Sequence, residues 1–240
     1  MNGKLILENG SEYNGVSFGY NQSIAGEVIF STNMVGYTES LTDPAYCGQI
    51  LCLTYPLIGN YGVPVSDKVD SNNLLVNMES NNIWIRALVV SNYGEDYSHY
   101  AADKSLSQWL IDNKIPALTG IDTRRLTKEL RINGSLKGKI VFNDDIDFVD
   151  INKLNLVQEV TCKTPYTLGK GILHIAVLDC GIKFNILRKL LGEGFKVTVV
   201  PYDHDFLNDN GFDGLFISSG PGNPLMCDIT INNLRKYINS

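Results

Sequence analysis

The sequence predicts an α/β protein in which a mixed β/β/α domain precedes the first part of a parallel-sheet domain. Short β-rich segments punctuated by Gly and Pro dominate residues 1–150. From residue 172 onward, strand, helix and strand alternate with short links, which is the pattern of a parallel sheet with right-handed crossovers. Residues 151–171 follow an acidic run and are polar, so we interpret them as a linker. The expected domains are therefore 1–150 and 172–240.

Composition describes a soluble globular protein and excludes several functional classes. The 240 residues are 44% hydrophobic and 19% charged, which is enough for real hydrophobic cores. A net charge of −6 argues against a nucleic-acid or membrane-surface partner, since either needs a basic face. No apolar run reaches the length of a bilayer span, and the first residues lack the character of a signal or transit peptide. We expect a cytoplasmic protein.

Cysteine and histidine usage predicts no metal site. The chain has five cysteines, an odd number without a Cys-x-x-Cys pair, and only three histidines. A zinc site normally needs four such ligands at characteristic spacings. Reduced thiols in the cytosol are the simplest interpretation.

The first domain is expected to begin with a β-hairpin. Asn9-Gly10 lies between two apolar segments, residues 5–7 and 13–18, and Asn-Gly is the strongest short hairpin signal because both turn positions favour positive φ. Apolar, strand-forming segments at 27–32 and 49–54 predict two further strands.

Loops are expected to separate these strands from the next apolar segment. Residues 41–46 contain Asp43-Pro44 and predict a loop with turn chemistry, and residues 55–64 predict an ordered loop. Residues 65–82 are polar and are assigned to the surface. Residues 83–90 predict a strand, whose Arg86 needs a partner or an exposed face.

Helical periodicity and capping residues place the remaining elements. Residues 105–114 predict a helix, and Asp122 caps a second helix with Leu126 and Leu130 on its buried face and Gly134 as its stop. Further strands are expected at 138–142, 172–178, 196–200 and 212–217, and helices at 185–191 and 228–238.

One turn in the second domain suits the binding of a negative group. The apolar run Leu215-Phe216-Ile217 leads through two serines into Gly220-Pro221-Gly222. Both glycines lack Cβ and allow a ligand to approach a bare N–H, while Pro221 stiffens the turn. A rigid turn with free amides at the carboxyl edge of a sheet fits a carboxylate or a developing oxyanion. Taken alone, however, the motif is better explained as a plain strand-to-helix turn.

Three other positions allow a functional and a structural interpretation. Cys180 follows a strand, but no His lies near it in the motif, so a structural thiol is favoured over a nucleophile. His204 is flanked by two acids and is interpreted as an exposed loop residue. Arg124-Arg125 begins a helix, where the helix dipole disfavours cations, so an anion or a partner's carboxylate competes evenly with a solvated surface pair.

Together, the motifs resemble the small, glutamine-hydrolysing part of carbamoyl-phosphate synthetase over essentially the whole chain. In the first domain the resemblance rests on Gly26-Glu27-Val28-Ile29-Phe30, Met34-Val35-Gly36-Tyr37-Thr38-Glu39, Leu41-Thr42-Asp43-Pro44, the segment 53–62 and Gly120-Ile121-Asp122-Thr123-Arg124. Residues 176–183 and 218–224 resemble the opening of a class I glutamine amidotransferase domain, which has a flavodoxin-like parallel sheet. The amino-acid sequence of these motifs is closer to the eukaryotic type of the family, which includes multifunctional chains of the pyrimidine pathway.

The resemblance implies a ligase that takes ammonia from glutamine. A cysteine thiolate attacks the glutamine amide, a His with a supporting Glu acts as base, and backbone N–H groups hold the oxyanion. A synthetase partner, a large subunit or domain, then uses ammonia, bicarbonate and ATP with Mg to make carbamoyl phosphate for pyrimidine or arginine biosynthesis. No cofactor is implied in this chain. The implied glutamine contacts are Gly220, Gly222 and Ala45, where Ala45 stands in place of the family's Ser.

The resemblance also implies that the catalytic machinery lies beyond Ser240. The nucleophile segment with its Cys, and the later His and Glu, have no counterpart in the 240 residues, so no catalytic residue is assigned. We expect the N-terminal part of the synthetase, inactive as a glutaminase by itself. One alternative is a non-catalytic docking or regulatory module, which a transcript ending at Ser240 would favour. A second alternative is an unrelated flavodoxin-like binding domain.

Overall fold

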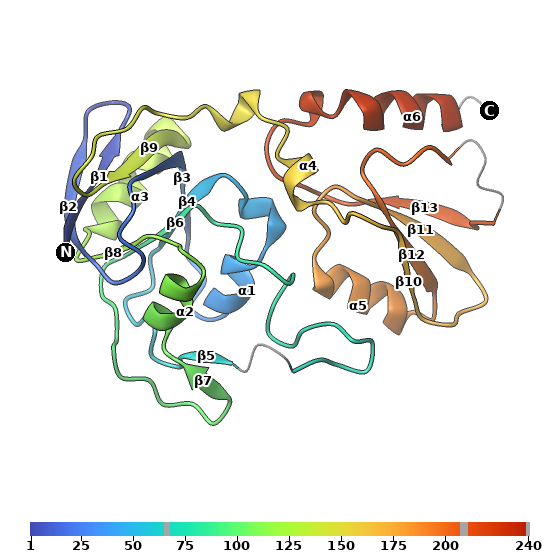
Figure 1. The fold of residues 1–240 in the computed structure, drawn as a ribbon, viewed down its shortest axis with the longest axis horizontal. Coiled ribbons are helices and arrows are strands. Elements are labelled where there is room, and N and C mark those ends of the chain that lie inside the picture. Colours follow the sequence, from blue (N-terminus) through green and yellow to red (C-terminus); the bar gives the residue numbers. More distant parts are fainter. Residues whose placement is uncertain (65–67, 207–210, 239–240) are drawn as a thin grey trace.

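The computed structural model describes residues 1–64, 68–206 and 211–238, which form a barrel domain and an open-sheet domain (Figure 1). The two lie side by side, with α4 and the segment leading to it between them. The expected α/β class, a mixed N-terminal domain followed by an amidotransferase-like sheet, is confirmed. Among the described helices, none has the length and apolar character that a membrane span needs.

The first domain is a closed barrel of seven strands. Their order around the barrel is β1-β2-β8-β6-β4-β3-β9, with β9 pairing back onto β1. The strands are β1 (Asn2–Leu7), β2 (Glu12–Ser17), β3 (Ile24–Ser31), β4 (Gln49–Leu53), β6 (Ala87–Val90), β8 (Ala117–Thr119) and β9 (Leu136–Val141). Outside the barrel are β5 (Val63–Pro64), β7 (Ala102–Lys104), α1 (Tyr37–Leu41), α2 (Leu106–Asp112) and α3 (Thr123–Asn133).

Four neighbouring barrel strands run in the same direction. β3 is parallel to β4, β4 to β6, and β6 to β8. Their carboxyl ends therefore meet at one rim of the barrel. Fully buried Leu and Ile side chains, such as Leu5, Ile50 and Leu118, form the core behind this rim.

Local turn and capping signals are confirmed. Gly10 has φ +88° and donates its N–H to the Leu7 carbonyl at 2.9 Å, which closes the hairpin, whereas Asn9 does not adopt the positive φ that the Asn-Gly pattern predicts. The side chain of Ser105 caps α2, and that of Asp122 accepts the Arg125 N–H at 2.9 Å to cap α3. Gly134 follows α3 with φ +80°.

Other expectations for this domain need correction. The loop expected at 41–46 is partly helical, because α1 ends at Leu41 and a 3₁₀ turn, η1 (Pro44–Tyr46), follows. The strand expected at 83–90 begins only at Ala87, since the Trp84 N–H bonds across to the Leu41 carbonyl instead of continuing the ladder. Arg86 does have a partner, Glu159, at 4.0 Å.

The polar segment assigned to the surface contributes to the core. In its described part, from residue 68, Leu74 and Met78 are 5% and 4% exposed. Leu74 packs with the apolar cluster of the second domain, which includes Leu187. This segment therefore joins the two domains, and its polar residues serve contacts between them.

The second domain is a four-stranded sheet between helices. Its order is β10-β12-β11-β13, in which β11 is parallel to both β12 and β13. The elements are η2 (Ile151–Lys153), α4 (Val157–Val160), β10 (Tyr166–Leu168), β11 (His174–Asp179), α5 (Phe184–Gly192), β12 (Lys196–Pro201), β13 (Gly214–Ile217), η4 (Pro224–Met226) and α6 (Asp228–Ile238). α5 and α6 cover opposite sides of the sheet (Figure 1).

The expected parallel sheet has one antiparallel strand. β10 pairs antiparallel with β12, through Tyr166 opposite Val199 and Leu168 opposite Val197. Its residues fall in the segment 151–171 that the sequence presents as a linker. Tyr166 and Leu168 pack against the apolar cluster of this domain, so burial holds a three-residue strand that its length alone did not reveal.

A carboxylate ties α3 to the hairpin, and its removal gives a testable stability change. Glu129 accepts hydrogen bonds from Asn9 Nδ2 (2.6 Å), Ser11 Oγ (2.6 Å) and Tyr13 Oη (2.5 Å). Burial opposes its charge, but these donors outweigh burial and lower the pKa of Glu129. We expect Glu129→Gln to lower the unfolding free energy at pH 7 by about 1–3 kcal/mol.

The sign of the pH dependence follows from the lowered pKa. This stabilisation is present above the ordinary carboxyl value of 4.5 and is lost as the pH falls through the folded value. The gap between wild type and Glu129→Gln in urea unfolding should therefore close under acid conditions. Glu12→Gln, which removes only an exposed pair with Lys4, is the control and should cost less than about 1 kcal/mol. A gap that persists in acid would contradict the assignment.

Candidate functional site

The Gly-Pro-Gly turn meets the turn that carries Ala45 at the junction between the domains. Gly181 lies between them: a Cβ built on it would be 3.2 Å from Pro221 Cδ and 3.3 Å from Pro44 Cβ. Gly181 has φ +122°, which side-chain-bearing residues rarely adopt. Glycine at this position thus allows the two turns to come together.

Hydrogen bonds from β11 fix the start of the Gly-Pro-Gly turn. Ser218 is 7% exposed, and its Oγ accepts the Cys180 N–H at 2.9 Å and donates to the Ser219 carbonyl at 2.9 Å. A Cβ on Gly220 would lie 2.0 Å from the Cys180 carbonyl oxygen. The glycine is therefore required by the close approach of two backbone segments.

A buried carboxylate organises the neighbouring turn. Asp179 Oδ1 accepts the N–H groups of Gly181 (2.9 Å) and Ile182 (2.8 Å), and its Oδ2 accepts the Cys162 N–H at 2.7 Å. Its own carbonyl accepts the Thr161 hydroxyl at 2.7 Å. Asp179 thus holds the end of β11 to the segment that enters the domain, and it makes the floor of the junction rigid.

The two predicted glycine contacts present open backbone. Gly220 and Gly222 are exposed, and Pro221 between them is buried. Within the described residues, the N–H groups of both glycines have no hydrogen-bond partner. Gly222 has φ +72°. The turn is therefore able to donate two N–H groups to an oxyanion or a carboxylate, and it is not filled by its own side chains.

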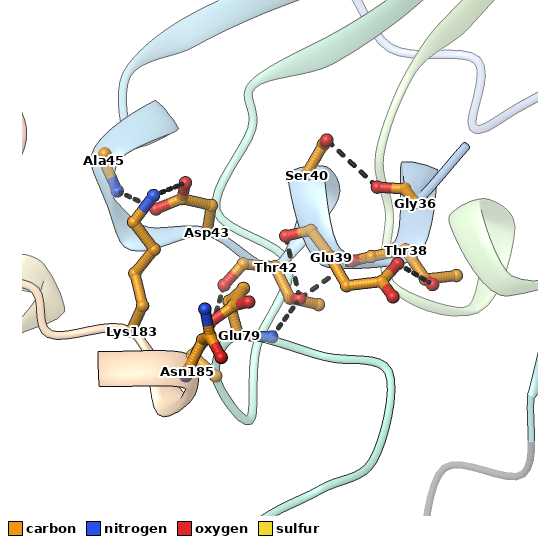
Figure 2. Close-up of polar contacts among 11 residues, drawn as sticks. Gly36, Thr38, Glu39, Ser40, Thr42, Asp43, Ala45, Glu79, Lys183 and Asn185 are labelled. Atoms are coloured by element: carbon orange, nitrogen blue, oxygen red, sulfur yellow. Dashed lines mark hydrogen bonds and ion pairs between the residues drawn. The ribbon is translucent and has the colours of Figure 1, made fainter. Parts of the chain in front are cut away.

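The backbone N–H of Ala45, unlike those of Gly220 and Gly222, already has a hydrogen-bond partner. Ala45 is half-buried in η1, and its N–H donates to Asp43 Oδ1 at 3.0 Å (Figure 2). Its backbone donor is therefore already used within the turn. A hydroxyl at this position would add a donor that the alanine lacks.

An ion pair joins the two domains beside Ala45. Lys183 Nζ lies 2.8 Å from Asp43 Oδ2, and the Asp43 side chain is only 10% exposed (Figure 2). Burial opposes the charge of Lys183, but the hydrogen bond to Asp43 and the nearby Glu79 outweigh it and raise the pKa of Lys183. The same carboxylate therefore caps η1 in one domain and holds the first turn of α5 in the other.

Glu79 adds a second polar link. Its N–H donates to Thr42 Oγ1 at 2.9 Å, while its Oε2 and its carbonyl accept the N–H groups of Asn185 (2.9 Å) and Phe184 (2.8 Å). Burial raises the pKa of Glu79. Sequence reasoning missed both Lys183 and Glu79 as junction residues, although Lys183 stands in a matching motif and Asp43 in a marked turn.

A cavity of about 460 Å³ lies next to the junction. Both domains line it, with Pro44 and Trp84 from the first and Asp179 and Ile182 from the second. Pockets of a few hundred Å³ at domain boundaries are typical of small-molecule sites. Ala45, Gly220 and Gly222 are not among its lining residues, so this cavity does not enclose the predicted glutamine contacts.

The cysteines are not activated. Burial raises the pKa of Cys47, Cys52, Cys162 and Cys180 to about 12, so these thiols are protonated at neutral pH. This agrees with the structural interpretation of Cys180. His204 lies outside the junction, with its ring 4.8 Å from that of Phe206. Among the described residues, no group of three or more His, Cys, Asp or Glu side chains is placed to hold a metal ion.

Two family models match the chain. The model described as "Carbamoyl-phosphate synthase small chain, CPSase domain" matches residues 5–140, and "Glutamine amidotransferase class-I" matches residues 176–240. The barrel and the open sheet thus fall in separate matches, and the junction described above brings residues of both together.

Curated relatives extend over almost the whole chain. It is 46% identical to the arginine-specific small chain of carbamoyl phosphate synthase from Saccharomyces cerevisiae, over 98% of this chain and 59% of the relative. It is 46% identical to multifunctional protein pyr1-3 of Dictyostelium discoideum and 48% identical to the mitochondrial carbamoyl-phosphate synthase [ammonia] of Aquarana catesbeiana. Each covers 98% of this chain, which spans 12% and 16% of those two relatives.

Proposed function

The chain belongs to the carbamoyl-phosphate synthase small-chain family, and on this basis we propose that it acts in glutamine-hydrolysing carbamoyl-phosphate synthesis. In this proposal the junction holds glutamine, whose side-chain amide is hydrolysed to ammonia. The ammonia passes to a synthetase partner, a large subunit or domain, which makes carbamoyl phosphate from bicarbonate and ATP. The names of the yeast and Dictyostelium relatives support a role in arginine or pyrimidine biosynthesis.

This proposal rests on one observation: a turn from each of the two family matches comes close to Gly181. The Gly-Pro-Gly turn comes from the amidotransferase match, and the Asp43–Ala45 turn comes from the small-chain match. Two open N–H groups, at Gly220 and Gly222, provide the donors that a tetrahedral oxyanion requires. N–H donors held on a rigid turn in this way are suited to acyl-transfer chemistry.

Further parts of the proposal concern the partner, the cofactors and the compartment. We assign ATP and Mg to the synthetase partner and no cofactor to this chain. All five cysteines are free, in line with a reducing compartment such as the cytoplasm. Cell fractionation tests the compartment directly, and recovery in an oxidising compartment would refute it.

We also propose that the 240 residues do not hydrolyse glutamine by themselves. A thiolate nucleophile is required for this chemistry, and the four thiols named above are held protonated by burial. Burial also raises the pKa of the fifth thiol, Cys227. A glutaminase assay on the purified chain is expected to show no turnover above buffer. Clear turnover would refute this part.

A docking or regulatory module is the second candidate. Two observations favour it: Ala45 lacks the hydroxyl of the family's Ser, and one relative at 48% identity is named for ammonia. The hypothesis of an unrelated flavodoxin-like domain is wrong, since the small-chain model matches residues 5–140.

Ala45→Ser distinguishes the two candidates. A hydroxyl restored at position 45, in the turn that meets the Gly-Pro-Gly turn, should add one hydrogen bond to bound glutamine and tighten its binding by about 0.5–1.5 kcal/mol, roughly two- to tenfold. Titration of glutamine followed by saturation-transfer NMR measures this. Ala101→Ser is the matched control, because it makes the same change at a half-buried alanine in the loop before β7.

The outcomes separate the candidates clearly. Glutamine binding that Ala45→Ser strengthens and Ala101→Ser does not supports a glutamine site at the junction. Association with a synthetase chain in a pull-down, without glutamine binding by either protein, supports the docking module. Failure to associate with a synthetase chain contradicts both.

A further inference from the structure

A second groove lies at the carboxyl ends of the parallel barrel strands. Its volume is about 570 Å³. Thr32, Thr54 and Ser91 line it, and each directly follows the last residue of β3, β4 or β6. The start of α3, which follows β8, completes the wall. Ligand sites in sheets with parallel strands are commonly built at this edge. None of its lining residues belongs to the glutamine junction.

The groove is positively charged within an acidic chain. Arg124, Lys128 and Arg131 line it along one face of α3 at spacings of four and three residues. Among the described residues, no carboxylate oxygen lies within 4.0 Å of these three cations. Asp122 is the one acid in the lining, and its Oδ1 is occupied by the Arg125 N–H. The lining therefore carries a formal charge of +2.

A buried hydroxyl without a partner lies behind the wall of the groove. Thr127 lines the same groove, is 8% exposed, and its Oγ1 has no hydrogen-bond partner within the described chain. Threonine in a helix usually donates to the carbonyl of the preceding turn. An unpaired buried hydroxyl costs free energy. The Oγ1 atom itself is closed to solvent, so it is not a contact for a ligand in the groove.

Arg125, which follows Arg124 in the sequence, does not line the groove, so only one face of α3 contributes to it. The Arg125 guanidinium lies 5.0 Å from the centre of the Tyr13 ring, against the hairpin and away from the groove. The Arg131 guanidinium carbon lies 5.4 Å from the centre of the Phe30 ring, and Arg131 also lines the groove. A cation over a ring face keeps N–H donors that an oxyanion can accept.

We propose that this groove binds a phosphate-type oxyanion carrying two negative charges. The charge of the lining matches a phosphate dianion, arginine and lysine supply charge-assisted donors, and Thr32 and Ser91 in the lining carry neutral hydroxyl donors. The volume also leaves room for a group attached to the phosphate. The site is independent of the glutamine proposal, because it uses a different rim of the first domain.

Titration of the 240-residue chain with inorganic phosphate and with pyrophosphate, by calorimetry at about 0.15 M salt, tests the proposal. We expect saturable binding at one site. Arg124→Gln and Lys128→Gln should each weaken it about tenfold, as expected for loss of one charge-assisted bond. Arg125→Gln, on the same helix, should leave it within about twofold. Adenosine monophosphate, titrated in parallel, distinguishes free phosphate from a phosphate ester.

Thr127→Val is a second control, because Thr127 lines the groove while its hydroxyl oxygen is closed to solvent. The change keeps the shape and removes only the unpaired hydroxyl, so the melting temperature should hold or rise while phosphate affinity stays within about twofold. Two results would overturn the proposal. One is the absence of saturable binding at about 10 mM anion, which is about the weakest affinity worth assigning. The other is an equal loss of affinity in Arg124→Gln and Arg125→Gln. Tighter binding of malonate than of phosphate would overturn the assignment to phosphate.

Discussion

Gly220→Ala is expected to lower the unfolding free energy of the second domain by about 3 kcal/mol or more, and its melting temperature by about 6 °C or more. The added Cβ would lie 2.0 Å from the Cys180 carbonyl oxygen and 2.9 Å from its carbon. Both atoms belong to backbone, which Ser218 Oγ and the ladder between β11 and β13 hold in place. No side-chain rotation relieves such a clash, so the turn must move away from β11.

Two other glycines provide a graded comparison. Gly222 has φ +72° and only ordinary contacts, the nearest at 3.4 Å, so Gly222→Ala should cost about 1–2 kcal/mol from backbone strain alone. Gly192 ends α5 with nothing within 4 Å, and Gly192→Ala should be neutral or stabilising by up to about 1 kcal/mol. Thermal unfolding, with hydrogen exchange at the Cys180 amide, measures the order. Equal stabilities of Gly220→Ala and Gly192→Ala would show that the close approach does not exist.

Local signals made much of the fold predictable. Asn9-Gly10, Asp122 and Gly134 act through their own backbone preferences, and the structure places a turn, a cap and a stop at those positions. Elements of two or three residues, such as β5, β8 and β10, contain too little sequence for a period to show. Closure of the barrel depends on the register between β1 and β9, which pairs residues far apart in the chain. Such non-local pairing leaves no local pattern.

The features of the candidate site also fall into two groups: those that the local sequence reveals and those that depend on contacts between distant residues. The Gly-Pro-Gly turn was visible because glycine and proline impose backbone geometry wherever they occur. Gly181 stands in the segment 176–183 that carries the family resemblance, but its role depends on Pro44 and Pro221 arriving from two different domains. The unpaired hydroxyl of Thr127 could not be inferred at all, because satisfaction of a hydrogen bond is a property of coordinates.

The polar segment before β6 shows why composition misled. Polar residues at 68–82 were assigned to solvent, yet Glu79 bonds to backbone across the junction, and Asp70 pairs with Arg188 at 2.8 Å. Interfaces between domains are more polar than cores, so their sequences resemble surface. A segment at such an interface can be told from a surface segment only by its contacts with residues more than 100 positions away in the sequence.

Loss of the ion pair at the junction should have the second large effect. Asp43→Asn leaves the Ala45 N–H with an acceptor but places an amide where Lys183 needs a negative charge. The Asp43 side chain is 10% exposed and that of Lys183 is 35% exposed, so solvent screens this pair more than a fully buried one. We therefore expect the variant to lose about 1–3 kcal/mol of unfolding free energy, which is less than the loss of a fully buried pair. Limited proteolysis of the segment 151–171, with urea unfolding, should show earlier separation of the domains in this variant.

A double-mutant cycle isolates the contact between domains from the local cap. Lys183→Met alone should cost a similar amount, while Asp43→Asn with Lys183→Met should cost at least about 1 kcal/mol less than the sum of the two. Lys4→Met, which breaks an exposed pair, should cost less than about 1 kcal/mol. Since the pKa of Lys183 is raised in the folded state, the coupling should be full below the unfolded lysine value near 10.5 and disappear as the pH rises through the folded value. Additive single effects at neutral pH would mean that Asp43 acts on η1 alone, and that the domains are held together by the Glu79 contacts and apolar packing.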